Sequence, residues 1–229
     1  NWQIAKNYFL QAIKINSNFS EAYNNLGLSE LNLGNLENAL ENFLNAIKIN
    51  PDYSYAHNNR GNSLLELKEF DKAIKCYDKA ISIEFDLFDA HYNKGIALNE
   101  IKKFNLAIKS YDQAIKINNE NADAYRNKAN SLYEIKKLDL ASENYDKAIK
   151  IKPDLDYLLC ASFFTKNSLC DWKNYNNNYD LLKKKTLNGD NASMPFNILS
   201  IYDSPSLQKI ASELNVKYKF TNNIKKKLI

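Results

Sequence analysis

Asparagine is the residue whose spacing along this chain suggests a chemical role. Asn25, Asn59, Asn93 and Asn127 follow one another at a constant interval. A carboxamide side chain offers both a hydrogen-bond donor and an acceptor, so a column of them can hold the backbone of an extended polypeptide. The residues predicted to bind a peptide are Asn25, Asn59, Asn93, Asn127, Asn62, Asn130 and Arg126. Because asparagine is abundant throughout the chain, a biased composition is the alternative explanation of the column.

No arrangement of residues indicates catalysis. His57 and His91 are the only histidines, and the same interval separates them, which predicts two equivalent structural positions rather than a base or a ligand. The sequence holds no nucleophile elbow, metal-ligand cluster or glycine-rich phosphate loop. We therefore predict no catalytic residue, no metal and no cofactor in this segment. The three cysteines lack a C-x-x-C spacing, which favours reduced thiols and a cytoplasmic location.

Composition narrows the fold class that must position these residues. The chain of 229 residues has 5 glycines and 4 prolines, where average usage gives roughly 16 and 11. This scarcity argues against a β-sandwich, a dinucleotide-binding domain and a phosphate-loop nucleotidase, and it favours an all-α protein. The net charge is +4 with only two arginines, which does not favour a nucleic-acid partner. No apolar run approaches the roughly 18 residues that a membrane span needs.

A 34-residue repeat organises the first two thirds of the chain. When positions 1 to 34 are numbered from Ser20, small residues recur at positions 8, 20 and 27, and an aromatic residue recurs at position 24. Position 20, for example, holds Ala39, Ala73, Ala107 and Ala141. The predicted divisions are a partial repeat at 1–19, full repeats at 20–53, 54–87, 88–121 and 122–155, and a helical extension at 156–229.

The spacing within each unit predicts a helix, a turn and a second helix. Positions 4, 7, 8 and 11 share one face of a first helix, and positions 20, 24 and 27 share one face of a second. Small residues let the two backbones approach closely, and the aromatic residue at position 24 fills the remaining space. Pro51 and Pro153, at position 32, are expected to end the second helix.

These positions resemble the tetratricopeptide repeat (TPR) over residues 1–155. The resemblance implies a right-handed superhelical solenoid of helical hairpins, in which the first helices line a concave groove. It further implies that the groove binds an extended protein or peptide segment. The column of asparagines looks like the asparagine ladder of O-linked N-acetylglucosamine (O-GlcNAc) transferases. A carboxylate clamp is the alternative, and only Arg126 with Asn130 fits it.

After Leu155 the repeat pattern weakens, but helices are still expected. One helix should take the place of the next first helix, and a longer second helix should run from an N-cap at Asp171 to Gly189. A last helix should follow Pro205, capped by Ser204 or Ser206. Cys170, Trp172 and Phe196 are expected to be buried in the core.

The same segment is similar to the linker that follows the TPRs in bacterial SPINDLY-type O-GlcNAc transferase homologues. The residues that carry this likeness are Cys170-Asp171-Trp172, Pro195-Phe196, Leu199, Asp203-Ser204-Pro205, Leu207-Gln208 and Ala211. The resemblance implies that a catalytic domain using a UDP-sugar donor follows the segment, with Leu228 and Ile229 at its first strand. The chain would then be the substrate-recognition arm of a glycosyltransferase. A free-standing TPR scaffold that recruits a partner protein is the alternative, so the enzyme class stays open.

Overall fold

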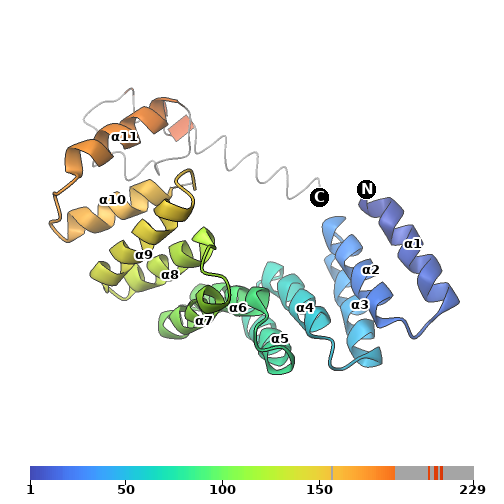
Figure 1. The fold of residues 1–229 in the computed structure, drawn as a ribbon. Coiled ribbons are helices and arrows are strands. Elements are labelled where there is room, and N and C mark those ends of the chain that lie inside the picture. The colour runs from blue at the N-terminus through green and yellow to red at the C-terminus, as the bar shows by residue number, and fades with distance from the viewer. Residues whose placement is uncertain (156, 189–205, 207–208, 211, 214–229) are drawn as a thin grey trace. The chain divides into compact units, whose positions relative to one another are not determined.

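The computed structural model describes residues 1–155, 157–188, 206, 209–210 and 212–213. All the secondary-structure elements defined in this part of the chain are α-helices, which confirms the all-α class. The described residues form two compact units, one up to Ile117 and one that begins at Asn118. Each unit is a row of helices that pack against their neighbours in sequence order (Figure 1).

The first unit holds a single helix followed by three helical hairpins. Their bounds are α1 Trp2–Ile15, α2 Ser20–Asn32, α3 Leu36–Ile49, α4 Ser54–Glu66, α5 Phe70–Ile83, α6 Phe88–Glu100 and α7 Phe104–Ile117. Helix α1 packs against α2, where the Lys6 ammonium pairs with the Glu30 carboxylate at 2.8 Å. Burial raises the pKa of Glu30, but hydrogen bonds from Lys6 and Asn35 outweigh it and leave the pKa below its usual value.

The second unit contains one further hairpin and two more helices. Their bounds are α8 Ala122–Glu134, α9 Leu138–Ile151, α10 Leu158–Ser168 and α11 Tyr175–Leu187. Helix α10 packs against α9 in the place expected for the next first helix. The Lys166 ammonium on α10 pairs with the Asp146 carboxylate on α9 at 2.7 Å, and Ser162 donates to the same carboxylate at 3.2 Å.

After the first helix of each of the four full repeats, the residue at repeat position 15 has a left-handed backbone conformation. The residues are Gly34, Lys68, Lys102 and Lys136, with φ between 58° and 82°. After α2, the Asn35 amide donates to the Glu30 carbonyl at 2.8 Å and the Gly34 amide donates to the Leu31 carbonyl at 3.0 Å. These two bonds define a Schellman motif, which satisfies the last carbonyls of the helix and turns the chain into the second helix.

Close backbone approach within each hairpin depends on the small residues. A Cβ atom on Gly61 would lie 2.6 Å from Cε1 of Tyr77, and the same holds for Gly27 against Phe43. Residues at positions 20 and 27, such as Ala73 and Ala80, are fully buried. The aromatic ring at position 24 therefore packs directly against the glycine at position 8, where a Cβ atom would take part of the space that the ring fills.

Proline is not what ends the second helices. Helices α3, α5, α7 and α9 all end at an isoleucine in repeat position 30. Pro51 follows α3 and Pro153 follows α9, but α5 and α7 end at the same position without a proline behind them. The extended backbone after α5, at Glu84 (φ −132°), matches the one after α3, at Asn50 (φ −126°).

The fifth hairpin keeps the turn of the repeat but loses its close packing. Cys170 stands one repeat period after Lys136 and has the same left-handed backbone, with φ 56°. Its side chain is exposed, so the prediction of a buried cysteine is wrong. Trp172 is 56% exposed and contacts the Tyr175 ring edge-on, so its predicted place in the core is also wrong.

Helix α11 begins later than predicted. Asn174 precedes it, and Asp171 instead accepts a hydrogen bond from the Lys173 amide at 3.2 Å within the turn. The helix has 13 residues, one fewer than α9, so it is not the longer helix we expected. Phe163 and Leu182 of this hairpin occupy positions that hold small residues in the other hairpins.

Several predictions concern residues outside the part of the chain that the structure describes. They are the helix stop at Gly189, the core position of Phe196, the cap at Ser204 for a helix that follows Pro205, and the strand start at Leu228 and Ile229. Ser206 is described, and its backbone is helical.

Candidate peptide-binding face

The predicted asparagines lie on the first helices, where several of them form hydrogen bonds with other asparagines. Asn25 on α2 accepts a hydrogen bond from Asn24 at 3.3 Å between Nδ2 and Oδ1. Asn59 on α4 donates from Nδ2 to Oδ1 of Asn24 at 3.0 Å, which joins the two first helices. Because Asn24 is buried, this bond is shielded from water and orders the column at its start.

The next asparagine of the column, Asn93, forms its hydrogen bond with a residue at a different repeat position. Asn93 on α6 donates from Nδ2 to Oδ1 of Asn62 on α4 at 2.9 Å. The Tyr77 hydroxyl donates to the same oxygen at 2.9 Å, so Asn62 accepts one bond from its own hairpin and one from the next. Burial raises the pKa of Tyr77 far above its ordinary value. Asn58, by contrast, has a buried Oδ1 with no hydrogen-bond partner.

Part of the hydrogen-bonding capacity of the column remains available. Asn25 uses only its oxygen and keeps both N–H donors, while Asn93 uses its nitrogen and keeps its carbonyl oxygen. Both side chains are half-buried, so solvent reaches them. The structure therefore brings Asn25, Asn59, Asn62 and Asn93 onto the first helices of the first unit.

The remaining predicted residues belong to α8 in the second unit. Arg126 pairs with Asp123 one turn earlier, at 2.7 Å between the guanidinium and the carboxylate. Asn130 accepts a hydrogen bond from the Tyr145 hydroxyl at 2.7 Å, the counterpart of the bond between Tyr77 and Asn62. Asn127 is half-buried on the same helix. Because Arg126 and Asn130 each already have a partner, a carboxylate clamp there would have to replace existing interactions.

The two histidines are structural, as predicted. The Nε2 atom of His57 lies 2.9 Å from the Pro51 carbonyl oxygen, and that of His91 lies 2.8 Å from the Phe85 carbonyl oxygen. Each ring thus ties the start of a first helix to the turn before it. Burial lowers the pKa of His57, so the neutral ring is favoured in the folded protein.

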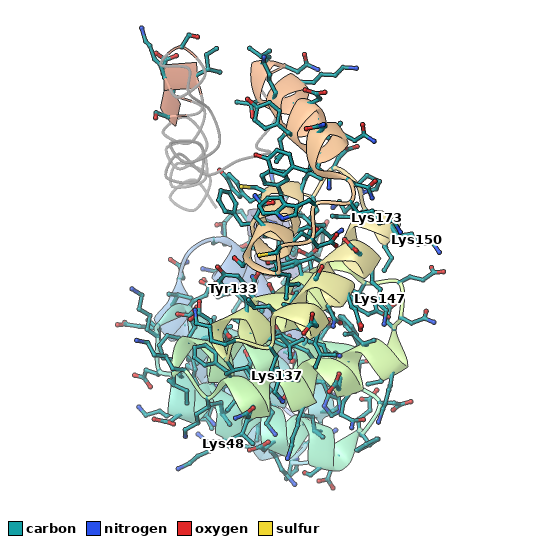
Figure 2. All side chains as sticks on the ribbon, turned by 90° about the vertical axis from the view of Figure 1, so that its left-hand side faces the viewer. Lys48, Tyr133, Lys137, Lys147, Lys150 and Lys173 are labelled. Carbon is teal, nitrogen blue, oxygen red and sulfur yellow. The ribbon has the colours of Figure 1, made fainter. Side chains whose placement is uncertain are left out.

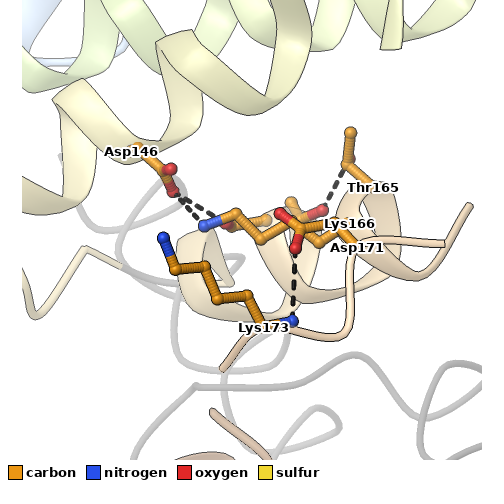
Figure 3. Close-up of polar contacts among 7 residues, drawn as sticks. Asp146, Thr165, Lys166, Asp171 and Lys173 are labelled. Carbon is orange, nitrogen blue, oxygen red and sulfur yellow. Dashed lines mark hydrogen bonds and ion pairs between the residues drawn. The ribbon is translucent and has the colours of Figure 1, made fainter. Parts of the chain in front are cut away.

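A small polar pocket of about 220 Å³ lies among α9, α10 and the turn before α11. Figure 3 shows its centre, where Lys166 reaches the Asp146 carboxylate and the Lys173 side chain extends in the same direction. The nearby Asp171 carboxylate accepts the bond from the Lys173 amide. These contacts join neighbouring helices of the second unit.

The second helices carry exposed lysines as well as acidic residues. Figure 2 shows Lys147 and Lys150 on α9, both exposed. The Lys147 ammonium also lies 5.8 Å from the centre of the Tyr125 ring, within the range of a cation–π contact.

A larger cleft in the first unit was not predicted from the sequence. It has a volume of about 790 Å³ and lies among α5, α6 and α7, and none of the predicted asparagines lines it. The available signal was the lysine shared by repeat position 22 of two successive second helices, Lys75 and Lys109. Such a charge pattern by itself indicates a solvated helix surface, because it does not reveal a gap between helices.

Neither a metal cluster nor a membrane-spanning helix occurs in the part of the chain that the structure describes. No group of three or more histidine, cysteine, aspartate or glutamate side chains among the described residues is placed to hold a metal ion. In the same part of the chain, every helix is too short or too polar to cross a membrane.

Comparison with known proteins identifies the repeat. Family models described as the tetratricopeptide repeat match residues 20–53, 54–86, 88–121 and 122–155. No curated protein matches the chain. Similar solved structures share 18–21% sequence identity with it, a level at which the likeness concerns the fold alone.

Three of these structures show the extent of the likeness. YrrB, described as a TPR protein with an unusual peptide-binding site, has a TM-score of 0.67 and 18% identity, over 90% of this chain and 97% of its own. PilF of Pseudomonas aeruginosa has a TM-score of 0.72 and 18% identity, over 80% and 84%. MamA of Desulfovibrio magneticus has a TM-score of 0.65 and 21% identity, over 70% and 91%. Since the family models cover more than half of the sequence, the chain belongs to the tetratricopeptide repeat family.

Proposed function

We propose that this chain is a protein-interaction module that binds an extended polypeptide on the face of its first helices. The observation that carries the proposal is the unused hydrogen-bonding capacity of the half-buried asparagines, donors on Asn25 and an acceptor on Asn93. An extended backbone presents the complementary groups, one N–H and one C=O from each residue. The fold that the chain shares with YrrB, whose description includes a peptide-binding site, supports the same interpretation.

The proposal can be tested without a known partner. Peptides would be selected from a random twelve-residue library on the immobilised full chain, and their affinities measured by fluorescence anisotropy. We expect Asn25→Ala, Asn59→Ala and Asn93→Ala each to weaken binding by about 3- to 10-fold, because a net hydrogen bond contributes about 0.5–1.5 kcal/mol. The matched control is Asn105→Ala on the exposed surface of α7. Unchanged affinity in the three folded variants would refute the role of the column.

We further propose that the module is the substrate-recognition arm of an O-GlcNAc-transferase-like protein glycosyltransferase. The support is the sequence likeness around Cys170-Asp171-Trp172, together with the exposure of Trp172, which leaves its ring available to another domain. A free-standing scaffold that recruits a partner protein is the competing function. The reading frame after Ile229 and UDP binding by the full-length product separate them. A stop codon there, or no detectable UDP binding, would favour the scaffold.

A further inference from the structure

The cleft among α5, α6 and α7 combines an apolar lining with charged walls. Ile74 and Ile81 of α5, Leu98 of α6, and Leu106 and Ile115 of α7 supply its aliphatic surface. Leu98 is almost completely buried, whereas Leu106 is 48% exposed, so apolar surface is accessible to a ligand. The volume of about 790 Å³ lies within the range of roughly 300–1,000 Å³ that is usual for ligand sites.

Positive charge predominates around this cleft. Five lysines and three aspartates line it, a formal excess of two positive charges. Asp78 is already paired with Lys94 at 2.5 Å. Four of the lysines have no ion pair in the described part of the chain: Lys75, Lys103, Lys109 and Lys116. Their ammonium groups are therefore available to carboxylates from outside the molecule.

The length of the cleft suggests the conformation of its ligand. The wall that Lys103 and the following helix α7 form runs from Lys103 to Lys116, a rise of about 20 Å at 1.5 Å per residue. An extended segment of about six residues spans the same distance at 3.3 Å per residue. In such a segment alternate side chains point to opposite faces, so aliphatic residues can face the apolar lining while acidic residues face the lysines.

We propose that this cleft is a second binding surface, which takes an extended acidic segment of a partner protein in which aliphatic and acidic residues alternate. This second surface goes beyond the proposed function. Its side chains are different from those of the asparagine column, and it selects its ligand by charge.

Single-stranded nucleic acid is the other polyanion to consider, and the cleft does not suit it. Proteins that bind single strands stack the bases on aromatic side chains, and no phenylalanine, tyrosine or tryptophan is among the residues that line the cleft.

Fluorescence anisotropy with the full 229-residue chain tests the proposal. The probe is a fluorescein-labelled peptide of sequence Asp-Leu-Asp-Ile-Glu-Leu-Glu, and its control replaces every acid by the corresponding amide. We expect binding of the acidic peptide that weakens at least tenfold when its acids are amidated, and that weakens again as salt is raised. A labelled ten-residue oligothymidylate is the third probe. Equal binding of the amide peptide, or tighter binding of the oligonucleotide, would overturn the proposal.

Two charge-reversal variants localise the site. Lys75→Glu with Lys109→Glu places acids on both walls of the cleft and should weaken the acidic peptide about tenfold or more. Lys48→Glu with Lys72→Glu changes the net charge equally at exposed positions outside the cleft, and should change the affinity less than twofold. Equal weakening by both variants would show unspecific attraction and refute the site.

One variant tests whether the apolar lining of the cleft contributes to binding, and another tests whether the cleft binds independently of the asparagine column. Leu106→Asn removes an aliphatic contact at a half-exposed position that tolerates a polar residue, and should weaken the peptide about threefold or more. Asn59→Ala combined with Asn93→Ala should leave its affinity unchanged. If the asparagine variant alone weakens the acidic peptide, the peptide binds to the first helices and the cleft proposal fails.

Discussion

Gly61 provides the sharpest test of how each hairpin is packed. In Gly61→Ala the new Cβ would lie 2.6 Å from Cε1, 2.9 Å from Cδ1 and 3.0 Å from Cζ of Tyr77. Carbon atoms in contact normally lie about 3.5–4.0 Å apart, so the ring must move by about 1 Å. Tyr77 is fully buried, and its hydroxyl bond to Asn62 resists that movement.

Two opposing effects set the size of the change. Overpacking a core costs about 1–3 kcal/mol, and weakening the hydroxyl bond adds about 1 kcal/mol. Replacing glycine by alanine inside a helix contributes about 1 kcal/mol of stability in the other direction. We therefore expect a net destabilisation of about 1–3 kcal/mol.

Urea titration followed by circular dichroism gives the measurement. The matched control is Ala129→Gly, because Ala129 is the fourth residue at repeat position 8. It should lose about 1 kcal/mol through helix propensity. If propensity alone governed this position, Gly61→Ala would stabilise the protein. A midpoint for Gly61→Ala at or above that of the unmodified chain would therefore refute the packing argument.

Three further predictions concern single residues. Lys102→Gly relieves a left-handed residue with φ 58°, and should raise the free energy of unfolding by about 0.5–1 kcal/mol; a lower urea midpoint would contradict this. Burial lowers the folded-state pKa of His57 below its unfolded value, so its stabilising contribution is present above about pH 6.5 and is lost as the pH falls toward the folded pKa. His57→Tyr should therefore lose less stability than the unmodified chain between pH 7 and 5.5, and parallel curves would count against burial as the cause. Cys170 is exposed while Cys76 and Cys160 are buried, so one thiol should react with a disulfide reagent in the native protein, and Cys170→Ser should abolish that fast phase.

The regular part of the fold follows from the sequence because local spacing determines it. Small residues at fixed intervals predicted the helical hairpins, and the recurrence of His57 and His91 predicted their structural role. Cys170 shows where the prediction failed. It continues the periodic series Gly34, Lys68, Lys102 and Lys136, so its turn was predictable in principle. Lysine has no preference for a left-handed backbone, so the residue types did not reveal the position.

The binding surfaces were less predictable for a different reason. The sequence identifies a column of asparagines, but not which amide bonds to which. Asn59 pairs with Asn24, whereas Asn93 pairs with Asn62, because the residues available on the preceding helix differ. The cleft exists because of the way α5, α6 and α7 pack together. Its presence is a property of the three packed helices and not of any one segment.

The double role of Asn62 has a consequence for the exchange of repeats. Asn62 accepts hydrogen bonds from Tyr77 in its own repeat and from Asn93 in the next. The same repeat position holds Leu28 in the preceding repeat and Ile96 in the following one, and neither side chain can accept these bonds. Swapping the order of residues 54–87 and 88–121 would keep the bond between Tyr77 and Asn62, which lies within one repeat, but it would place Asn93 after Leu28 instead of Asn62 and so remove that acceptor. These repeats share one backbone, but they are not interchangeable modules, and a gene rearrangement that keeps the repeat period would still have to preserve their order.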